Sequence, residues 1–228
     1  MSNSSLALPN FVKTASRRLR ALAIRSHQDQ RGVAAIEFAL LLPVMLLMYF
    51  ASAEVTKGVL AGRKITIATR ALADLLGQQS GTVDYPTLQS ILGAASPILS
   101  PLTTTNMKVT LSSVSFIQIG TSNTYNARTD WTMPTYGNPP RPCQVLNQTA
   151  NDAAPTPNGV PVGLYGPGSV VVADVTYVYP TPFSIDIGSW KSPANITFKR
   201  SMFFAPRNTT TVAFKGNDPQ VTLCTYPP

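Results

Sequence analysis

The chain has 228 residues and a formal net charge of +8, although only 12% of its residues are charged and 44% are hydrophobic. This hydrophobic content excludes a disordered tail, which needs low hydrophobicity and high charge. With one histidine, His27, and two cysteines, Cys143 and Cys224, the chain is short of the residues that zinc sites and Ser-His or Cys-His catalysis require, so its composition points away from an enzyme.

Residues 1–32 are basic, with six Lys and Arg residues against one acid, Asp29, and therefore a net charge of +5. The cluster Arg17-Arg18-Leu19-Arg20 is open to two interpretations. It is either a nucleic-acid patch or the flank of a membrane segment, which the positive-inside rule keeps in the cytoplasm. We favour the second interpretation and expect no nucleic-acid partner.

Residues 33–53 form an apolar run that carries a single charge, Glu37. A helix of this length spans about 30 Å, the thickness of the hydrocarbon core of a bilayer. The helical pattern continues to Gly77, the predicted end of the helix, with charged residues interleaved. The sequence therefore predicts a transmembrane helix that Pro43 bends, followed by an amphipathic extension over 54–80.

Residues 81–228 are predicted to form an α+β domain outside the membrane. Asp84 is the expected N-cap of a short helix, which Pro97 and Pro101 end. Alternating polar and apolar residues then predict an antiparallel sheet. Its expected strands are 107–116, 124–132, 169–179 and 195–205, with shorter ones at 209–214 and 220–224.

Two irregular features are expected within this domain. The alternation changes phase at Val114, which indicates either a bulge or burial on both faces of the strand. The stretch 134–168 is rich in proline and glycine and is predicted to be a long loop.

The junction between the leader and the apolar helix is the most informative segment. It reads Arg31-Gly32-Val33-Ala34-Ala35-Ile36-Glu37-Phe38, with a glycine before the helix and a glutamate at its fifth position. This junction resembles the prepilin processing motif of type IVb pilins, in particular that of the TadE-like minor pilins (pseudopilins) of the tight-adherence, or Tad/Flp, pilus system. Later segments, including Asp130-Trp131 and Val171–Tyr177, are similar to longer members of that family, so the resemblance covers most of residues 31–207.

The resemblance implies that a prepilin peptidase of the membrane cuts between Gly32 and Val33 and removes the leader together with His27. The mature subunit would then be anchored in the bacterial inner membrane with its N-terminus in the cytoplasm. Its outer domain would be periplasmic or exposed on a pilus. Its expected partners are the peptidase and other pilin and minor pilin subunits. It would be a structural protein and not an enzyme, with no cofactor, no metal and no small-molecule substrate.

Glu37 and Phe38 complete the motif and are the expected assembly residues. A carboxylate in a membrane helix costs up to about 3 kcal/mol at the bilayer centre, and less near an interface. One interpretation is that Glu37 lies near the cytoplasmic edge and reaches the headgroups. The interpretation that the motif favours is that Glu37 pairs with the terminal amine at Val33 of a neighbouring subunit and sets the register of the helix in a filament.

Two further features of the helix leave alternatives open. Ala51-Ser52-Ala53 has the form of a signal peptidase site. Cleavage after Ala53 would release a binding or adhesion module that starts at Glu54, and an uncleaved chain would be a membrane-anchored one. Gly58 and Gly62 lie four residues apart and would permit a close helix contact in a filament, but we favour the interpretation that they are small residues without a role, because they lie past the apolar run.

Cys143 and Cys224 both lie on the expected outer side of the membrane. In an oxidising periplasm two cysteines indicate one disulfide, which would close a loop of about 82 residues. The alternative is a pair of free buried thiols.

Overall fold

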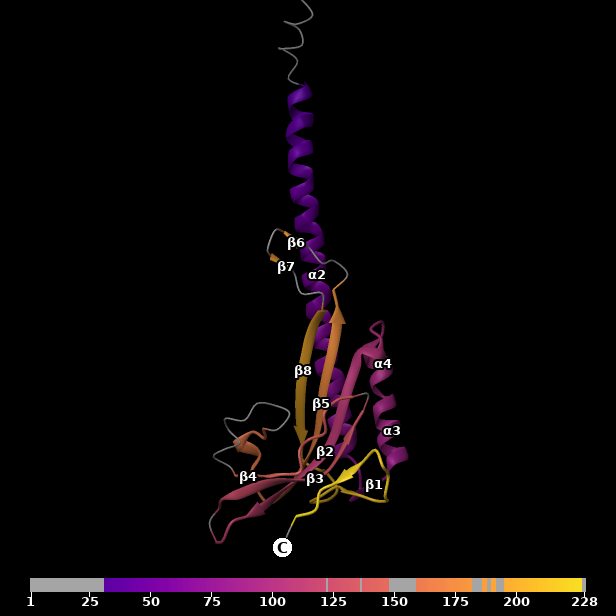
Figure 1. Ribbon diagram of the computed structural model, residues 1–228, viewed down its shortest axis with the longest axis vertical. Helices are drawn as coiled ribbons and strands as arrows, with labels where there is room; N and C mark the ends of the chain where they lie inside the picture. The colour runs from indigo at the N-terminus through magenta and orange to yellow at the C-terminus, as the bar shows by residue number, and fades with distance from the viewer. Residues whose placement is uncertain are drawn as a thin grey trace, which may run out of the picture. The chain divides into compact units, whose positions relative to one another are not determined.

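The computed structural model describes residues 31–121, 123–135, 137–147, 159–181, 186–187, 190–191 and 195–226 (Figure 1). The leader 1–30 lies outside the described residues. The chain divides into two compact units, Met1–Val55 and Thr56–Pro228. The boundary falls within one helix, two residues beyond the predicted end of the transmembrane segment at residue 53.

Helix α2, Arg31–Gly77, contains both the apolar run and its amphipathic extension. It ends at the glycine that the sequence predicts, and Pro43 lies inside it without ending it. By length and composition, α2 is the one helix among the described residues that is apolar enough to cross a membrane. The long apolar N-terminal helix is thus confirmed, and it is consistent with a membrane anchor.

Two short helices follow in the unit Thr56–Pro228. Helix α3, Tyr85–Gly93, has the predicted N-cap, because the Asp84 carboxylate accepts a hydrogen bond from the Thr87 backbone N–H at 3.0 Å. Helix α4, Ala95–Leu99, contains Pro97, which was expected to end a helix. Pro97 is tolerated because it lies in the first turn, where a backbone N–H has no partner within the helix. Two single-turn 3₁₀ helices, η1 (Thr104–Asn106) and η2 (Val162–Leu164), complete the helical elements of the described residues.

The main sheet is antiparallel, as the sequence predicts, and has the order β10-β3-β2-β5-β8, with β4 pairing with another part of β3. Its strands are β2 (Met107–Gln118), β3 (Tyr125–Pro134), β4 (Val145–Asn147), β5 (Gly168–Pro180), β8 (Asn195–Phe204) and β10 (Thr222–Leu223). Two small pairs lie outside it: β1 (Thr82–Val83) with β9 (Ala213–Phe214), which are parallel, and β6 (Asp186–Ile187) with β7 (Trp190–Lys191), which are antiparallel.

The change of phase in the polar and apolar alternation of β2 has both of its expected causes, a bulge and burial on both faces of the strand. The register between β2 and β3 shifts between Ser113 and Val114, so that Asp130 is the extra residue of a bulge in β3. A strand with one face in solvent alternates between buried and exposed residues, because successive side chains point to opposite faces. In fact β2 is buried on both faces from Val109 to Phe116.

Each face of the sheet has its own core. On one face α2 packs with side chains three and four residues apart, a spacing that places them on one side of a helix: Ala61, Ile65, Ala68, Leu72 and Leu76. Each fully buried Leu or Ile side chain contributes about 1.5–3 kcal/mol. A smaller core covers the other face and contains Val114, Phe116, Tyr125, Ala127, Val160, Val170 and Val172. The second half of α2 is therefore part of the globular unit.

The predicted Pro- and Gly-rich loop, 134–168, lies partly outside the described residues. Its described part includes β4 and η2, so it contains short regular elements. Residues 136 and 148–158 are outside the described ranges, and the expectation of one long loop stays a prediction there.

Candidate functional site: the start of helix α2

The four residues expected to direct processing and assembly lie in the first turns of α2. Gly32, Val33, Glu37 and Phe38 are all exposed, and a Cβ atom added at Gly32 would meet nothing within 4 Å. Val33 and Glu37 are four residues apart, so their side chains lie on one face of the helix, one turn from each other. A carboxylate is thus held one helical turn from the point where a new N-terminus would form.

The surface that surrounds this site is apolar. Every residue from Gly32 to Ser52 is exposed, and thirteen large hydrophobic side chains between Val33 and Phe50 are at least 39% exposed. Soluble proteins rarely leave an apolar surface of this extent uncovered. The arrangement suits a lipid environment or apolar helices of other molecules.

No group of three or more His, Cys, Asp or Glu side chains lies close enough to hold a metal ion in the part of the chain that the structure describes. Two carboxylates of the sheet, the buried Asp174 and the half-buried Asp130, are held in hydrogen-bonded networks of their own.

The pair Gly58 and Gly62 divides into two different positions. A Cβ atom at Gly62 would lie 3.1 Å from the ring of Phe198, so this glycine allows β8 to approach α2 within the domain. A Cβ atom at Gly58 would meet nothing within 4 Å. The structure thus gives Gly62 a packing role inside the chain, and only Gly58 has open space for another molecule.

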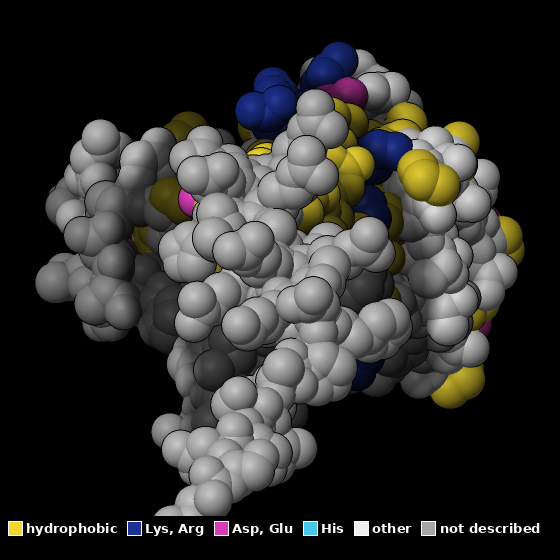
Figure 2. All heavy atoms as spheres, turned by 90° about the horizontal axis from the view of Figure 1, so that it is seen from above, with side chains coloured by type: hydrophobic (Ala, Val, Ile, Leu, Met, Phe, Trp, Pro, Cys, Tyr) yellow, Lys and Arg dark blue, Asp and Glu magenta, His cyan; other side chains and the backbone are white. Residues whose placement is uncertain are grey.

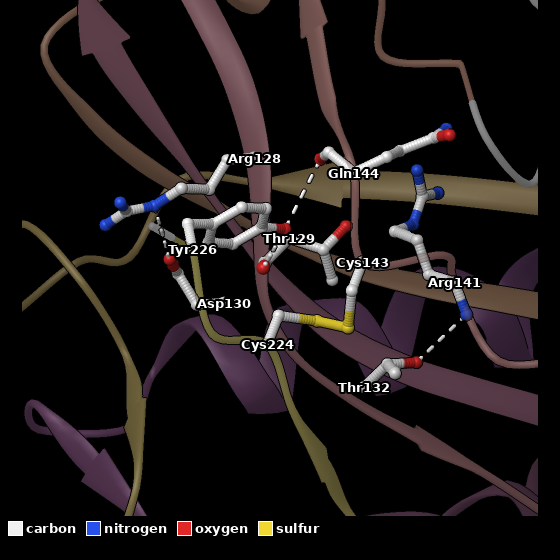
Figure 3. The surroundings of a disulfide bond; sticks show 9 residues. All are labelled: Arg128, Thr129, Asp130, Thr132, Arg141, Cys143, Gln144, Cys224 and Tyr226. Carbon is white, nitrogen blue, oxygen red and sulfur yellow. Dashed lines mark hydrogen bonds and ion pairs between the residues drawn. A yellow bond between two sulfur atoms is a disulfide. The ribbon is translucent and has the colours of Figure 1, made fainter. Parts of the chain in front are cut away.

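Cys143 and Cys224 are joined by a disulfide with a Cα–Cα distance of 5.3 Å (Figure 3). Cys143 precedes β4 and Cys224 follows β10, and both of these short strands pair with the outer edge of β3. The disulfide therefore ties together the two segments that cover this edge. The Tyr226 hydroxyl adds a further link, because it donates to the backbone oxygen of Thr129 at 2.8 Å.

The bulge residue Asp130 lies beside this disulfide. Its carboxylate accepts a hydrogen bond from Ser115 Oγ at 2.7 Å and lies 3.6 Å from the Arg128 guanidinium. Its backbone oxygen accepts from the Cys224 N–H at 2.9 Å. Burial raises the pKa of Asp130 above its ordinary value of 3.8, while the Ser115 hydrogen bond and the Arg128 charge oppose that rise.

A buried ion pair that the sequence did not reveal fixes the preceding segment to the sheet. Arg141 Nη2 lies 3.0 Å from Asp174 Oδ2, and the two side chains are only 2% and 6% exposed. Ser201 also donates to Asp174, and the Arg141 N–H donates to Thr132 Oγ1 at 3.0 Å. Burial raises the pKa of Asp174, against the charge of Arg141 and the Ser201 hydrogen bond.

The sequence carried one signal for this pair. Asp174 interrupts a run of valines in a strand that is buried on both faces, and a buried carboxylate requires a cation or several donors. The sequence did not indicate which of the distant cations would supply that charge.

Residues 32–74 match the family model described as TadE-like protein. A search of curated proteins and a search of solved structures found no match. The matched residues begin at the glycine of the processing motif and end three residues before the end of α2, so the β-sheet lies outside the match. The chain carries a TadE-like domain at residues 32–74, and this confirms its resemblance to the pilin-type proteins of the Tad system.

Proposed function

We propose that this chain is a minor pilin-like subunit of Tad/Flp pili, a type IVb system, and that a prepilin peptidase cuts its precursor between Gly32 and Val33. The observation that carries the proposal is the coincidence of three boundaries. The TadE-like domain begins at Gly32, the basic leader ends there, and the apolar run starts at the next residue, Val33. A domain that begins where the motif places the cut fits a mature subunit that begins at the next residue.

In this proposal Glu37 is the register residue of assembly. The new α-amine at Val33 is mostly cationic near neutral pH, because its reference pKa is near 8. In lipid, a carboxylate and an amine are both more stable paired than alone. Glu37 and the amine share one face of α2 within a chain. When a neighbouring subunit is displaced along the axis of α2, the Glu37 carboxylate of one subunit can therefore pair with the Val33 amine of the next, instead of with the amine of its own chain.

The proposal also assigns the topology. The leader, with its net charge of +5, stays in the cytoplasm, and residues 33–53 cross the inner membrane. The extension 54–80 and the domain 81–228 then lie in the periplasm or on the pilus, where a disulfide between Cys143 and Cys224 is chemically stable. Other pilin and minor pilin subunits are the proposed partners of the exposed apolar surface.

Two substitutions test processing and assembly separately. Gly32→Val should block the cut, so that the intact mass of the chain stays that of the precursor. Glu37→Gln should leave the cut and the outer domain unchanged but reduce the pili recovered by shearing cells. Glu54→Gln, which removes another carboxylate of the same helix, is the matched control and should assemble normally. Normal processing of Gly32→Val, or normal pili with Glu37→Gln, would contradict the proposal.

A binding or adhesion module remains the second candidate, and a cleft of about 700 Å³ between α3 and the sheet favours it. No charged side chain is among its described lining residues, and its polar side chains form a chain of hydrogen bonds. Gln89 Nε2 donates to the Tyr85 hydroxyl at 2.8 Å, which donates to Gln220 Oε1 at 2.6 Å. Such a cleft suits an uncharged ligand. A mature chain that starts at Glu54 would favour this candidate.

A further inference from the structure

The exposed face of α2 within the unit Thr56–Pro228 combines cationic and apolar side chains. Four cations, Lys57, Arg63, Lys64 and Arg70, occur between Val55 and Ala73, and no acidic residue occurs there. Val59, Leu60 and Ile67 are 51–58% exposed among them. A mixture of Lys or Arg with exposed apolar side chains is typical of helices that lie against membrane headgroups.

Strand β8 adds a further cation to this face. Arg200 Nε donates to Thr66 Oγ1 at 3.2 Å, and Phe198 packs against Gly62, so this part of β8 lies along α2. Arg63 and Arg200 both line a groove of about 520 Å³, whose other lining residues are mostly small or apolar. Figure 2 shows, on the face of the molecule seen from above in Figure 1, dark blue cationic side chains beside yellow hydrophobic ones.

These cations are available to an external anion. Lys57, Arg63, Arg70 and Arg200 are exposed, and none of them is in a salt bridge with another described residue. Lys64 differs, because its ammonium group donates to the backbone oxygen of Ser100. We call Lys57, Arg63 and Arg200 the cationic surface.

We propose that the cationic surface binds the headgroups of anionic phospholipids in the membrane that α2 crosses. The inference rests on the membrane-anchor part of the proposed function and adds a lipid class to it. The surface follows directly after the apolar run, and its apolar neighbours suit the boundary between headgroups and acyl chains. An acidic protein would pair with the cations but would leave Val59 and Leu60 without an apolar environment.

The spacing along α2 predicts that the cations differ in importance. An α-helix rises about 1.5 Å per residue, so Lys57 lies about 6 Å of helix beyond residue 53, Arg63 about 15 Å and Arg70 about 25 Å. Charges are screened over about 8 Å at physiological ionic strength. Lys57 should therefore contribute most to lipid binding, Arg63 less, and Arg70 least.

The test uses the full chain purified in a neutral detergent with equal amounts of dioleoyl-phosphatidylglycerol and dioleoyl-phosphatidylcholine. Native mass spectrometry then measures the ratio of the two lipids retained on the protein. A cation at an anionic surface favours binding by about fivefold. The double variant Lys57→Gln/Arg63→Gln should thus lower the preference for phosphatidylglycerol by about fivefold or more, or remove it. Arg70→Gln is the matched control on the same helix and should stay within about twofold of the parent.

Three outcomes would overturn the inference: equal retention of both lipids by the parent, an unchanged preference in the double variant, or an equal loss with Arg70→Gln. Failure of the proposed function has a different signature. A chain that does not anchor would be recovered in the soluble fraction of cells rather than with the membranes. An anchored chain without a lipid preference would contradict the inference alone.

Discussion

Removal of one partner of the buried ion pair tests the packing of the outer domain most sharply. In Arg141→Met the Asp174 carboxylate keeps its burial, at 6% exposure, but loses the cation 3.0 Å away. Breaking a pair of this kind lowers the free energy of unfolding by about 3–5 kcal/mol, because an uncompensated charge is left in the interior. Domains are stabilised by about 5–15 kcal/mol in total, so the variant should lose a large part of its stability.

The loss should depend on pH. Burial already raises the pKa of Asp174, and removal of Arg141 removes the largest influence that opposes this rise. A carboxyl group with a raised pKa in the folded state holds its proton more tightly there than in the unfolded state. The folded variant is therefore most stable below that pKa and loses stability as the pH rises through it. The deficit relative to the parent should be larger at pH 8 than at pH 5.

Urea unfolding of the detergent-solubilised full chain measures these differences. Trp131 is a suitable fluorescent reporter, since it is 1% exposed and its indole N–H donates to the Val212 backbone oxygen at 2.8 Å. The double variant Arg141→Met/Asp174→Leu is the control and should recover most of the stability, because an apolar pair of similar volume often replaces a buried ion pair without loss. A loss below about 1 kcal/mol in Arg141→Met that is the same at both pH values would refute the reasoning.

Three further predictions use the same assay. Gly62→Leu should lower the free energy of unfolding by about 1–3 kcal/mol, because the new Cβ atom meets the ring of Phe198. Gly58→Leu should leave the free energy of unfolding unchanged, because its Cβ atom meets no neighbour. An equal effect of the two would contradict the packing. Replacement of Cys143 and Cys224 by serine should cost about 2–4 kcal/mol, since their disulfide closes a separation of 81 residues, and no loss would show that the edge strands hold without it. Asp130→Asn should gain stability relative to the parent as the pH rises above 3.8, because the raised pKa makes the ionised aspartate unfavourable in the folded state. A variant that instead gains stability relative to the parent as the pH falls would contradict this expectation.

Much of the fold follows from local patterns in the sequence. The end of α2 at Gly77 and the cap at Asp84 were predicted, and the bulge beside Val114 was one of the two alternatives that the change of phase indicated. Each of these features depends on residues within one turn of a helix or on neighbours in one strand. Pro97 was misjudged for a local reason as well, because a proline ends a helix from its interior but is accepted in its first turn.

The features that escaped prediction depend on contacts between distant parts of the chain. Arg141 lies 33 residues before Asp174, in a Pro-rich segment without a periodic pattern, and its burial depends on how that segment crosses the sheet. The role of Gly62 likewise depends on Phe198, which a later strand brings against α2. The processing motif lay within eight consecutive residues, and for that reason it was visible in the sequence.

The N-terminal sequence of the mature protein tests the central claim most directly. The chain should be isolated from the membranes of cells that contain the prepilin peptidase, and its first residues should be determined by Edman degradation or by mass spectrometry of its N-terminal peptide. The account predicts a chain that begins Val33-Ala34-Ala35. A mature chain that begins at Glu54, or one that keeps residues 1–32, would contradict it.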